Sequence, residues 1–500
     1  MYLRIHIYMN ESNVGVYPSL VTAIQFFITV LRLSCRYSNS RRAALTGLLR
    51  SASEAIRIWK LGSKTLRDLG ATSHTSMTTA AQVATLTAIL LQHLKDAGQN
   101  NDTIATSFLS STMDDVETSN HTVGFEKSMW YKEEKGERLM VGTHIDDFMI
   151  GGTTQNVIDT FRDRLLTRFE GTREGTLHHY LGCRITRDLK QGVTTLDQAH
   201  YTERVLKMFN AWNIAPKKMP MLPDTRLSID DCNHGYVEPS FHKKYSGIVG
   251  CLGWLNSMTR PDLSFVFSSL SRYVQYPGQA HMDAALHALA YLRGSIDQGL
   301  VYTTSADPAH GRLWGWVDAD YAGCQDTRKS HTGYVLMLNG AAISWKSKRQ
   351  STVSLSSAES EYIAASHCSQ EVIYLREILR GFNCAQDEPT VIFEDNQACI
   401  AMSENQVHRE RSRHIDVRKY FVRDLVDDKV LKLIHCKTNE MVADALTKSL
   451  PYPSFSLHRE KMTGIVQANS LFLAKSGGSL GSNRGVGDGG LICLCDCCAV

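Results

Sequence analysis

The sequence has no apolar run long enough to cross a membrane. Its most apolar stretch, from Leu20 to Leu31, is short and is interrupted by two threonines and a glutamine. A membrane-spanning helix needs about 20 mostly apolar residues, so the pattern predicts a buried helix. The stretch follows the polar segment MNESN, and no small-residue cleavage site is evident after it. These features exclude an ordinary secretory signal.

An excess of charge of one sign is also absent. The chain has 54 Lys and Arg against 51 Asp and Glu, which gives a net charge of +3. Attraction to nucleic acid would therefore depend on local basic patches and not on overall charge. The 13 cysteines show no framework of short spacings, which excludes a secreted disulfide scaffold and favours an intracellular compartment. The composition, with 43% hydrophobic residues, is that of a globular protein long enough for two or three domains.

The two ends of the chain carry no recognisable chemistry. Residues 1–125 combine the apolar stretch with segments of helical periodicity and a polar segment rich in Ser, Thr and Asn. Residues 453–500 are rich in Gly and Ser, which predicts a flexible tail. The cysteines near the carboxyl end have no partner His, so we expect no zinc site there.

A paired carboxylate stands between two apolar runs in LMVGTHIDDFMIGG. The pattern predicts a strand, a tight turn that carries Asp146 and Asp147, and a returning strand. Adjacent acids at a hairpin tip can hold divalent metal ions, which prefer oxygen ligands. Acidic pairs are also common in solvated turns and helix caps, so this pair alone leaves both interpretations open.

Residues 313–350 have the pattern of three antiparallel strands. The second and third strands flank Asn339-Gly340, the strongest short signal for a hairpin. The first strand contains Asp318 and Asp320, which alternate onto one face. Either acid is therefore placed to face a site on that side of the sheet.

A long amphipathic helix follows these strands. Ser356 and Glu359 form a capping box at its start, and Gly381 marks its end. The motif AESEY offers two glutamates, Glu359 and Glu361, as candidate metal ligands. Glu359 already has a capping role and Glu361 has none, so we assign the metal-binding position to Glu361.

Two more acids lie on later elements. Asp395 ends the predicted strand TVIFED, where it either faces a cleft or caps the next helix. Asp444 lies in the helical pattern MVADALTKSL, where an ionised carboxylate is costly unless a cation lies opposite. With helices at QACIAMSE and about 416–426 and a strand at VLKLIHC, these elements predict an α+β or α/β fold built on a mixed five-stranded sheet with flanking helices.

Linked motifs connect the paired carboxylate to the later acids, in the order YLGCRITRD, LDQAHYTERVLKMFN, APKKMPM and YSGIVGCLGWLNSMTRPDL. From Arg138 to Pro451 the chain resembles copia-type LTR retrotransposon Pol polyproteins, over the C-terminal part of the reverse transcriptase and the ribonuclease H domain. The resemblance implies a partial reverse-transcriptase palm, thumb and connection over residues 126–305. It implies a ribonuclease H domain over residues 306–452 and leaves residues 1–125 unmatched.

The hairpin departs from the family pattern. Copia-type enzymes usually carry Tyr-Val-Asp-Asp where this chain has His144-Ile145-Asp146-Asp147. The family also places a catalytic Asp on an earlier palm strand, and we find no equivalent upstream of Arg138, because Asp114-Asp115 lacks an apolar strand. A two-metal polymerase site needs ligands from both strands. The resemblance therefore implies RNA-directed DNA polymerase ancestry with an incomplete polymerase site.

For the later domain, the resemblance implies metal-dependent cleavage of RNA in RNA–DNA hybrids. Two Mg2+ ions, with Mn2+ as a substitute, would lower the pKa of the attacking water and stabilise the leaving oxygen. His435 would assist proton transfer, although a lone His after a strand is more often structural. The family favours Asp318 over Asp320 as the first ligand. The expected metal ligands are Asp318, Glu361, Asp395 and Asp444, with Asp146 and Asp147 in the palm.

The expected partners are an RNA–DNA hybrid and a template with its primer, with no membrane, in the cytoplasm, a virus-like particle or the nucleus. Two basic clusters would hold phosphates without reading sequence, although each also fits a solvated loop. They comprise Lys346, Lys348, Arg349, Arg411, Arg413 and His414. Two alternatives stay open: a catalytically inactive nucleic-acid-binding remnant of a retroelement, and an integrase-type nuclease. The second usually has a His/Cys zinc module, and the sequence shows none.

Overall fold

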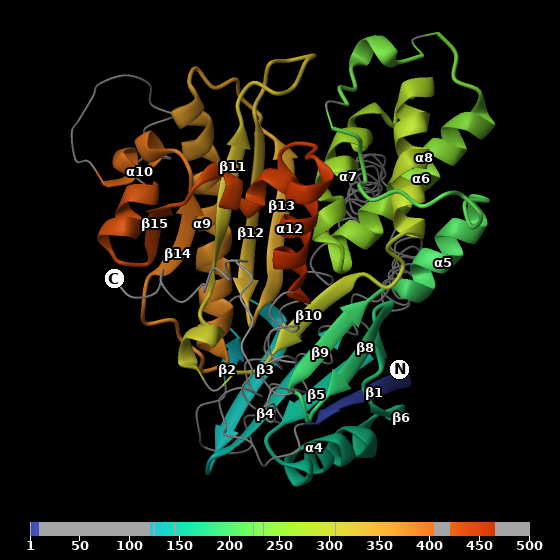
Figure 1. Cartoon of the computed structure of the whole chain (residues 1–500). Helices are drawn as coiled ribbons and strands as arrows, with labels where there is room; N and C mark the ends of the chain where they lie inside the picture. Colours follow the sequence, from blue (N-terminus) through green and yellow to red (C-terminus); the bar gives the residue numbers. More distant parts are fainter. Residues whose placement is uncertain are drawn as a thin grey trace, which may run out of the picture.

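The computed structural model describes residues 2–9, 121–123, 126–144, 147–223, 225–233, 235–305, 307–404 and 421–465 (Figure 1). Within these ranges the chain forms three sheets, which we number in chain order, and a group of helices beside them. Among the described helices, none is long and apolar enough to span a lipid bilayer. Several predictions fall outside the described residues: the N-terminal helices, Asp114-Asp115, Asp146, Arg411, Arg413, His414 and the terminal cysteines.

The first sheet contains the predicted hairpin. Its strand order is β2 (His121–Val123), β3 (Glu126–Glu134), β4 (Glu137–His144), β5 (Asp147–Gly152), β1 (Tyr2–Met9) and β6 (Glu170–Thr176). β4 and β5 are antiparallel, with His144 opposite Asp147, so the two predicted strands are confirmed, and Asp147, predicted in the turn, begins the second strand. β1 runs parallel to both β5 and β6, a pairing of distant segments that no local pattern indicated. α4 (Gln155–Arg168) packs Ile158 and Leu165 into the core of this sheet.

The second sheet adjoins a helical layer. Its strand order is β10 (Gly299–Thr303), β9 (Val193–Asp197), β8 (Cys183–Asp188) and β7 (His179–Tyr180). The helices α5 (Ala199–Met208), α6 (Pro239–Met258), α7 (Ser264–Leu270) and α8 (Gln279–Arg293) share an apolar core of their own. Arg260 and Asp262 form a fully buried ion pair there, with 2.8 Å between Nη2 and Oδ2. Tyr291 donates its hydroxyl to Asp262, so the pair is satisfied.

The third sheet confirms the mixed five-stranded arrangement expected from the sequence. Its order is β13 (Ala341–Arg349), β12 (His331–Leu338), β11 (Trp314–Asp320), β14 (Thr390–Glu394) and β15 (Leu431–His435). The first three strands are antiparallel neighbours, whereas β14 runs parallel to β11 and β15 runs parallel to β14. Asn339 and Gly340 both have positive φ, as a tight turn between β12 and β13 requires.

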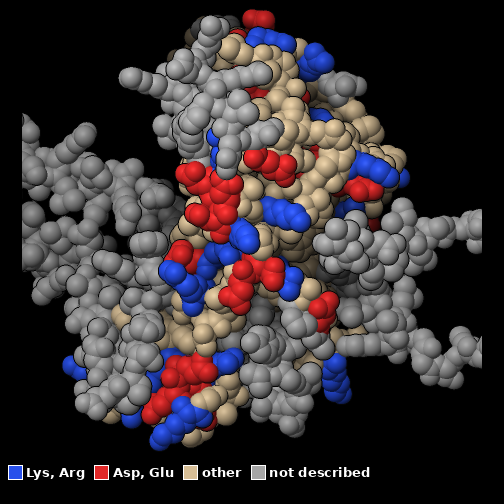
Figure 2. Space-filling view, turned by 90° about the vertical axis from the view of Figure 1, so that its left-hand side faces the viewer, with Lys and Arg blue, Asp and Glu red and all other residues tan. Residues whose placement is uncertain are grey.

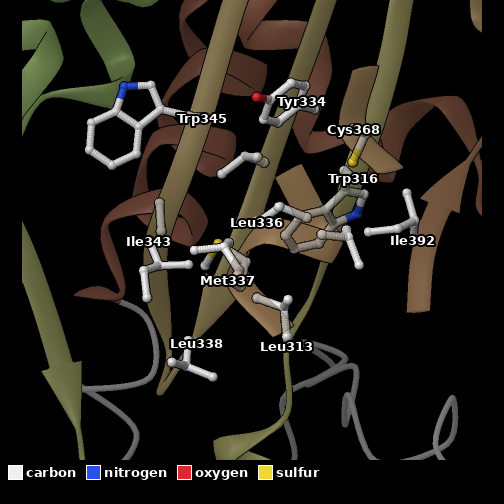
Figure 3. Packing of buried hydrophobic residues seen from close by; sticks show 14 of the residues in the cluster. Leu313, Trp316, Tyr334, Leu336, Met337, Leu338, Ile343, Trp345, Cys368 and Ile392 are labelled. Carbon is white, nitrogen blue, oxygen red and sulfur yellow. The ribbon is translucent and has the colours of Figure 1, made fainter. Parts of the chain in front are cut away.

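Helix α9 (Ser357–Gly381) packs along the third sheet and lies behind it in Figure 1. Ser356 caps the helix by accepting the Glu359 N–H, and the Glu359 carboxylate accepts the Leu355 N–H at 2.7 Å. The predicted cap at Ser356 and the helix end at Gly381 are confirmed, whereas Glu359 bonds the N–H of Leu355 and not that of Ser356, as a capping box would. Figure 3 shows the core between these elements, in which Trp316, Ile392 and Cys368 come from β11, β14 and α9. α10 (Gln397–Glu404) and a helix over residues 421–427 complete this part of the chain.

Two predictions near the carboxyl end are wrong. The segment that contains Asp444 forms two short 3-10 helices, η5 (Thr438–Glu440) and η6 (Val442–Leu446), and not an α-helix. The η6 residues are buried against β11 and β12, and this packing overrides the local helical pattern. The flexible tail predicted from residue 453 is wrong for residues 453–463, because α12 (Tyr452–Thr463) buries Phe455 and Met462 against the rest of the protein, and the residues after 465 lie outside the described ranges.

The first and third sheets share one apolar core. Met129, Tyr131 and Met140 of the first sheet belong to the same buried cluster as the strands of the third. Tyr131 meets Phe382, beside the end of α9, edge to face with ring centroids 6.2 Å apart. Asn383 donates its side-chain amide to Glu133 at 3.0 Å. Segments assigned to different domains from the sequence therefore pack as one body.

Candidate active site

Three acids from different elements of the third sheet converge on one point. β11 and β14 are parallel, with Trp316 opposite Phe393, so Asp318 and Asp395 each lie two residues further along and at the same end of the sheet. Glu361 reaches the same end from the first turns of α9. One carboxylate oxygen of each of Asp318, Glu361 and Asp395 lies within 4.8 Å of the others. The structure thus brings together three of the four acids predicted from the sequence.

Asp444 approaches the same acids from η6. The Thr447 hydroxyl, at the end of this segment, donates a hydrogen bond to Asp318. Lys448 Nζ lies 2.8 Å from Asp444 Oδ1. η6 can lie this close to β12 because residue 333, which pairs with Asp318, is a glycine. A Cβ there would come within 2.6 Å of Thr447 Cγ2 and 3.0 Å of the Ala443 carbonyl oxygen.

Burial changes the acidity of these groups. Asp318, Glu361 and Asp444 are only 4%, 5% and 6% exposed. Burial, together with the neighbouring Asp444, raises the pKa of Asp318 to about 7. Burial, followed by the charges of Glu394 and Asp318, raises the pKa of Glu361 to about 11. Burial also raises the pKa of Asp444, and the positive charge of Lys448 partly offsets this rise.

A fifth acid, Glu394, lies beside the cluster and was missed in the sequence. It is fully buried, and burial raises its pKa to about 8. Its Oε1 accepts the Asn396 N–H at 3.1 Å, whereas Oε2 has no hydrogen-bond partner. Glu361 Oε2 is likewise buried without a partner. In the sequence, the only sign of Glu394 was its position next to Asp395 in EDN. Neighbouring residues of a strand normally face opposite ways, so this adjacency did not predict that both acids meet at the site.

The remaining predicted site residues lie around this cluster. Asp320 is half-buried and stands outside the three-acid group. His435 is exposed at the end of β15, opposite Glu394 in the strand register. Thr438, in the next loop, donates its hydroxyl to Asp395 at 3.0 Å. Asp147 begins β5 in the first sheet and does not belong to the three-acid group.

The first basic cluster lies on the outer strand β13. Lys348 is exposed there, and Lys346 and Arg349 are half-buried. Arg349 donates to Cys324 Sγ at 3.3 Å, so this side chain is engaged within the protein. Figure 2 shows the left-hand side of Figure 1, where the Lys and Arg of the described residues are interspersed with Asp and Glu. This distribution agrees with the small net charge of the chain.

Comparison with known proteins gives the family. A family model described as reverse transcriptase (RNA-dependent DNA polymerase) matches residues 87–223. The Pol polyprotein of transposon TNT 1-94 from Nicotiana tabacum is 38% identical over 319 residues, which cover 63% of this chain and 24% of that protein. The matched residues thus belong to the reverse transcriptase family, and most of the chain is similar to copia-type retrotransposon Pol polyproteins. The Pol polyprotein of transposon RE2 from Arabidopsis thaliana is 30% identical over 351 residues, which cover 69% of this chain and 23% of that protein.

The chain spans about a quarter of the length of these relatives. The reverse-transcriptase match begins at residue 87, upstream of the boundary near 125 drawn from the sequence. Among solved structures, LC11-RNase H1, isolated from compost by a metagenomic approach, is similar over 27% of this chain and 93% of its own length. The sequence identity is 12% and the TM-score is 0.22.

Proposed function

We propose that residues 306–452 form a metal-dependent ribonuclease H that cleaves the RNA strand of RNA–DNA hybrids. The observation that carries the proposal is the convergence of Asp318, Glu361 and Asp395 within 4.8 Å of one another. Carboxylate oxygens are the ligands that Mg2+ prefers, and Mn2+ accepts the same donors. The third sheet, with β14 and β15 added parallel to an antiparallel trio, has the strand arrangement expected of a ribonuclease H fold.

The residues present fit divalent cations. Glu361 and Glu394 each have a buried oxygen without a hydrogen-bond partner, and a buried ionised carboxylate is costly unless a cation offsets it. Asp318, Glu361, Asp395 and Asp444 would hold the ions. When bound, the ions would lower the pKa of an attacking water and offset charge on the leaving 3′-oxygen.

The other side chains would position these ligands and move protons. Thr447 fixes one oxygen of Asp318, and Thr438 fixes one oxygen of Asp395. Fixed carboxylates lose less freedom when they bind an ion or a phosphate. His435, exposed beside the carboxyl end of β14, would supply a proton to the leaving oxygen.

Substrate binding is assigned to the two basic clusters identified in the sequence. Lys346 and Lys348 on β13 would contact phosphates, and we assign the same role to Arg349 and to the cluster at Arg411, Arg413 and His414. Phosphate contacts set the register of a nucleic acid, and a hybrid is distinguished from duplex DNA by its shape and 2′-hydroxyls. A template with its primer would bind through the same contacts.

We propose further that the palm hairpin does not form a complete polymerase site in this chain. Asp147 begins β5, which pairs with β4 on one side and with β1 on the other. β1 has the sequence YLRIHIYM, which contains no acid. A two-metal polymerase needs acids from both strands. Primer extension on an RNA template tests this point, and robust DNA synthesis would overturn it.

The cleavage proposal is tested with end-labelled RNA annealed to DNA, incubated with the full chain and Mg2+. We expect cleavage by the wild type and by Asp387→Asn, a substitution at an exposed loop acid of the same region. Asp395→Asn should abolish it. A catalytically inactive remnant would bind the hybrid without cutting it, and equal cleavage by Asp395→Asn and Asp387→Asn would also contradict the proposal.

A further inference from the structure

Lys448 forms an ion pair with one acid of the candidate active site. Its Nζ lies 2.8 Å from Asp444 Oδ1, and its side chain is 41% exposed. Asp318 and Asp320 also attract it electrostatically. In the part of the chain that the structure describes, this is the one ion pair formed by any of the four candidate ligands.

The two sides of the acid cluster therefore differ. Asp318, Glu361 and Asp395 form a tight group of oxygens, and none of them has an ion pair among the described residues. Asp318 and Asp444 form the other side, where the Lys448 ammonium already supplies one positive charge. A divalent ion that binds Asp444 on this second side would lie close to the Lys448 ammonium. Like charges repel strongly at short range.

We propose that Lys448 holds the place of the second divalent ion and must move into solvent before that ion binds. The proposal rests on the proposed function, because it assigns a regulatory residue to the same metal site. The first ion would bind at the three-acid group without competition, and the second would bind more weakly. Lys448 can leave because its flexible four-carbon stem is partly exposed and lies at the rim of the site.

The test measures ion binding directly, without nucleic acid. Mn2+ alone is titrated into the full chain by calorimetry, with free ion followed by its electron paramagnetic resonance signal. We expect one tighter and one weaker site in the wild type. In Lys448→Met, the Kd of the weaker site should fall at least about tenfold, because removal of a neighbouring charge relieves the repulsion. Lys448→Arg keeps the charge and should bind like the wild type.

The matched control is Lys432→Met, at an exposed lysine of β15. It should leave both Kd values unchanged. Thermal unfolding supplies a second readout: Lys448→Met should melt lower than the wild type in EDTA and gain more from Mn2+, since Asp444 then lacks its cation until an ion binds. Lys448→Gln repeats both measurements with a second neutral side chain. Unchanged Kd values in Lys448→Met and Lys448→Gln, with an equal melting shift at all Mn2+ concentrations, would overturn the proposal.

The outcome is separable from that of the hybrid-cleavage assay. If the chain cleaves hybrids and its Mn2+ affinity does not change when Lys448 is replaced, this inference alone is contradicted. A chain whose weaker site tightens in Lys448→Met but which does not cleave hybrids contradicts the proposed function alone.

Discussion

Thr447 lies 129 positions from Asp318 in the sequence, yet its hydroxyl donates a hydrogen bond to an oxygen of that buried carboxylate. The same hydroxyl lies 3.1 Å from the Asp444 carbonyl oxygen. Thr447 thus ties the first strand of the site to the segment that carries the last acid, and the geometry of the site depends on this link.

Replacement of Thr447 by Val should destabilise the metal-free protein. The substitution keeps the shape of the side chain but leaves an oxygen of Asp318 without its donor, which costs about 1–3 kcal/mol for a charged acceptor. Urea unfolding at pH 8 in EDTA measures the loss. Thr447→Ser keeps the hydroxyl and should lose less, and equal free energies of unfolding for the Val and Ser variants would argue against the link.

The stability of the metal-free protein should fall as the pH rises from 5 to 8. The pKa values of Asp318 and Glu394 are raised to about 7 and about 8, above the ordinary values of 3.8 and 4.5. The folded state therefore binds more protons than the unfolded state in this window, and that stabilisation is lost as the carboxyls ionise. Melting temperatures in EDTA measure the slope.

Two additions check the origin of this pH dependence. Glu394→Gln should flatten the slope, because the amide does not ionise. Mg2+ at pH 8 should restore much of the lost stability, because bound cations favour the ionised acids. A melting temperature that rises between pH 5 and pH 8 in EDTA, and equally in Glu394→Gln, would show that other groups dominate.

Gly333→Ala should disturb the site through packing alone. The new Cβ would lie 2.6 Å from Thr447 Cγ2 and 2.9 Å from Leu446 Cβ, so η6 must shift. Overpacking of this kind costs about 1–3 kcal/mol, and hybrid cleavage should fall with it. Gly250→Ala is the control, because a Cβ there meets nothing within 4 Å and Ala favours the helix by about 0.5–1 kcal/mol. Equal stability and cleavage in the two variants would contradict the close-packing argument.

Asp262→Asn should destabilise the helical layer. Arg260 and Asp262 are 1% and 0% exposed, and loss of one partner leaves a buried charge uncompensated, at a cost of about 3–5 kcal/mol. Glu377→Gln breaks the ion pair with the exposed Arg380 and should cost less than about 1 kcal/mol. Guanidinium unfolding compares the two. A difference below the error of the measurement would mean that Arg260 finds another partner.

Local patterns in the sequence predicted the elements that depend on local chemistry. Asn339-Gly340 indicated the hairpin because both residues accept positive φ. The cap formed by Ser356 and Glu359 fixed the start of α9 and left Glu361 as the glutamate without a structural task, and Glu361 is the one that meets Asp318 and Asp395.

The features that the sequence did not reveal depend on contacts between distant segments. Lys448 has the spacing from Asp444 of an ordinary helical ion pair, and only the position of η6 makes it part of the acid cluster. Glu394 was hidden because strand alternation predicts that it points away from Asp395. The pairing of β1 with the first sheet and the packing of α12 on the third sheet were not predicted for the same reason: no periodicity within a segment specifies its distant partner.

The shared core of the first and third sheets has a consequence for how this chain unfolds. Tyr131 and Phe382 bury each other across the boundary at residue 306, and Glu133 accepts a hydrogen bond from a residue 250 positions away. Excision of the carboxyl half would expose that apolar surface to water and lose the contact energy on both sides. The two halves should therefore melt in a single cooperative transition, and a fragment cut at the boundary should aggregate.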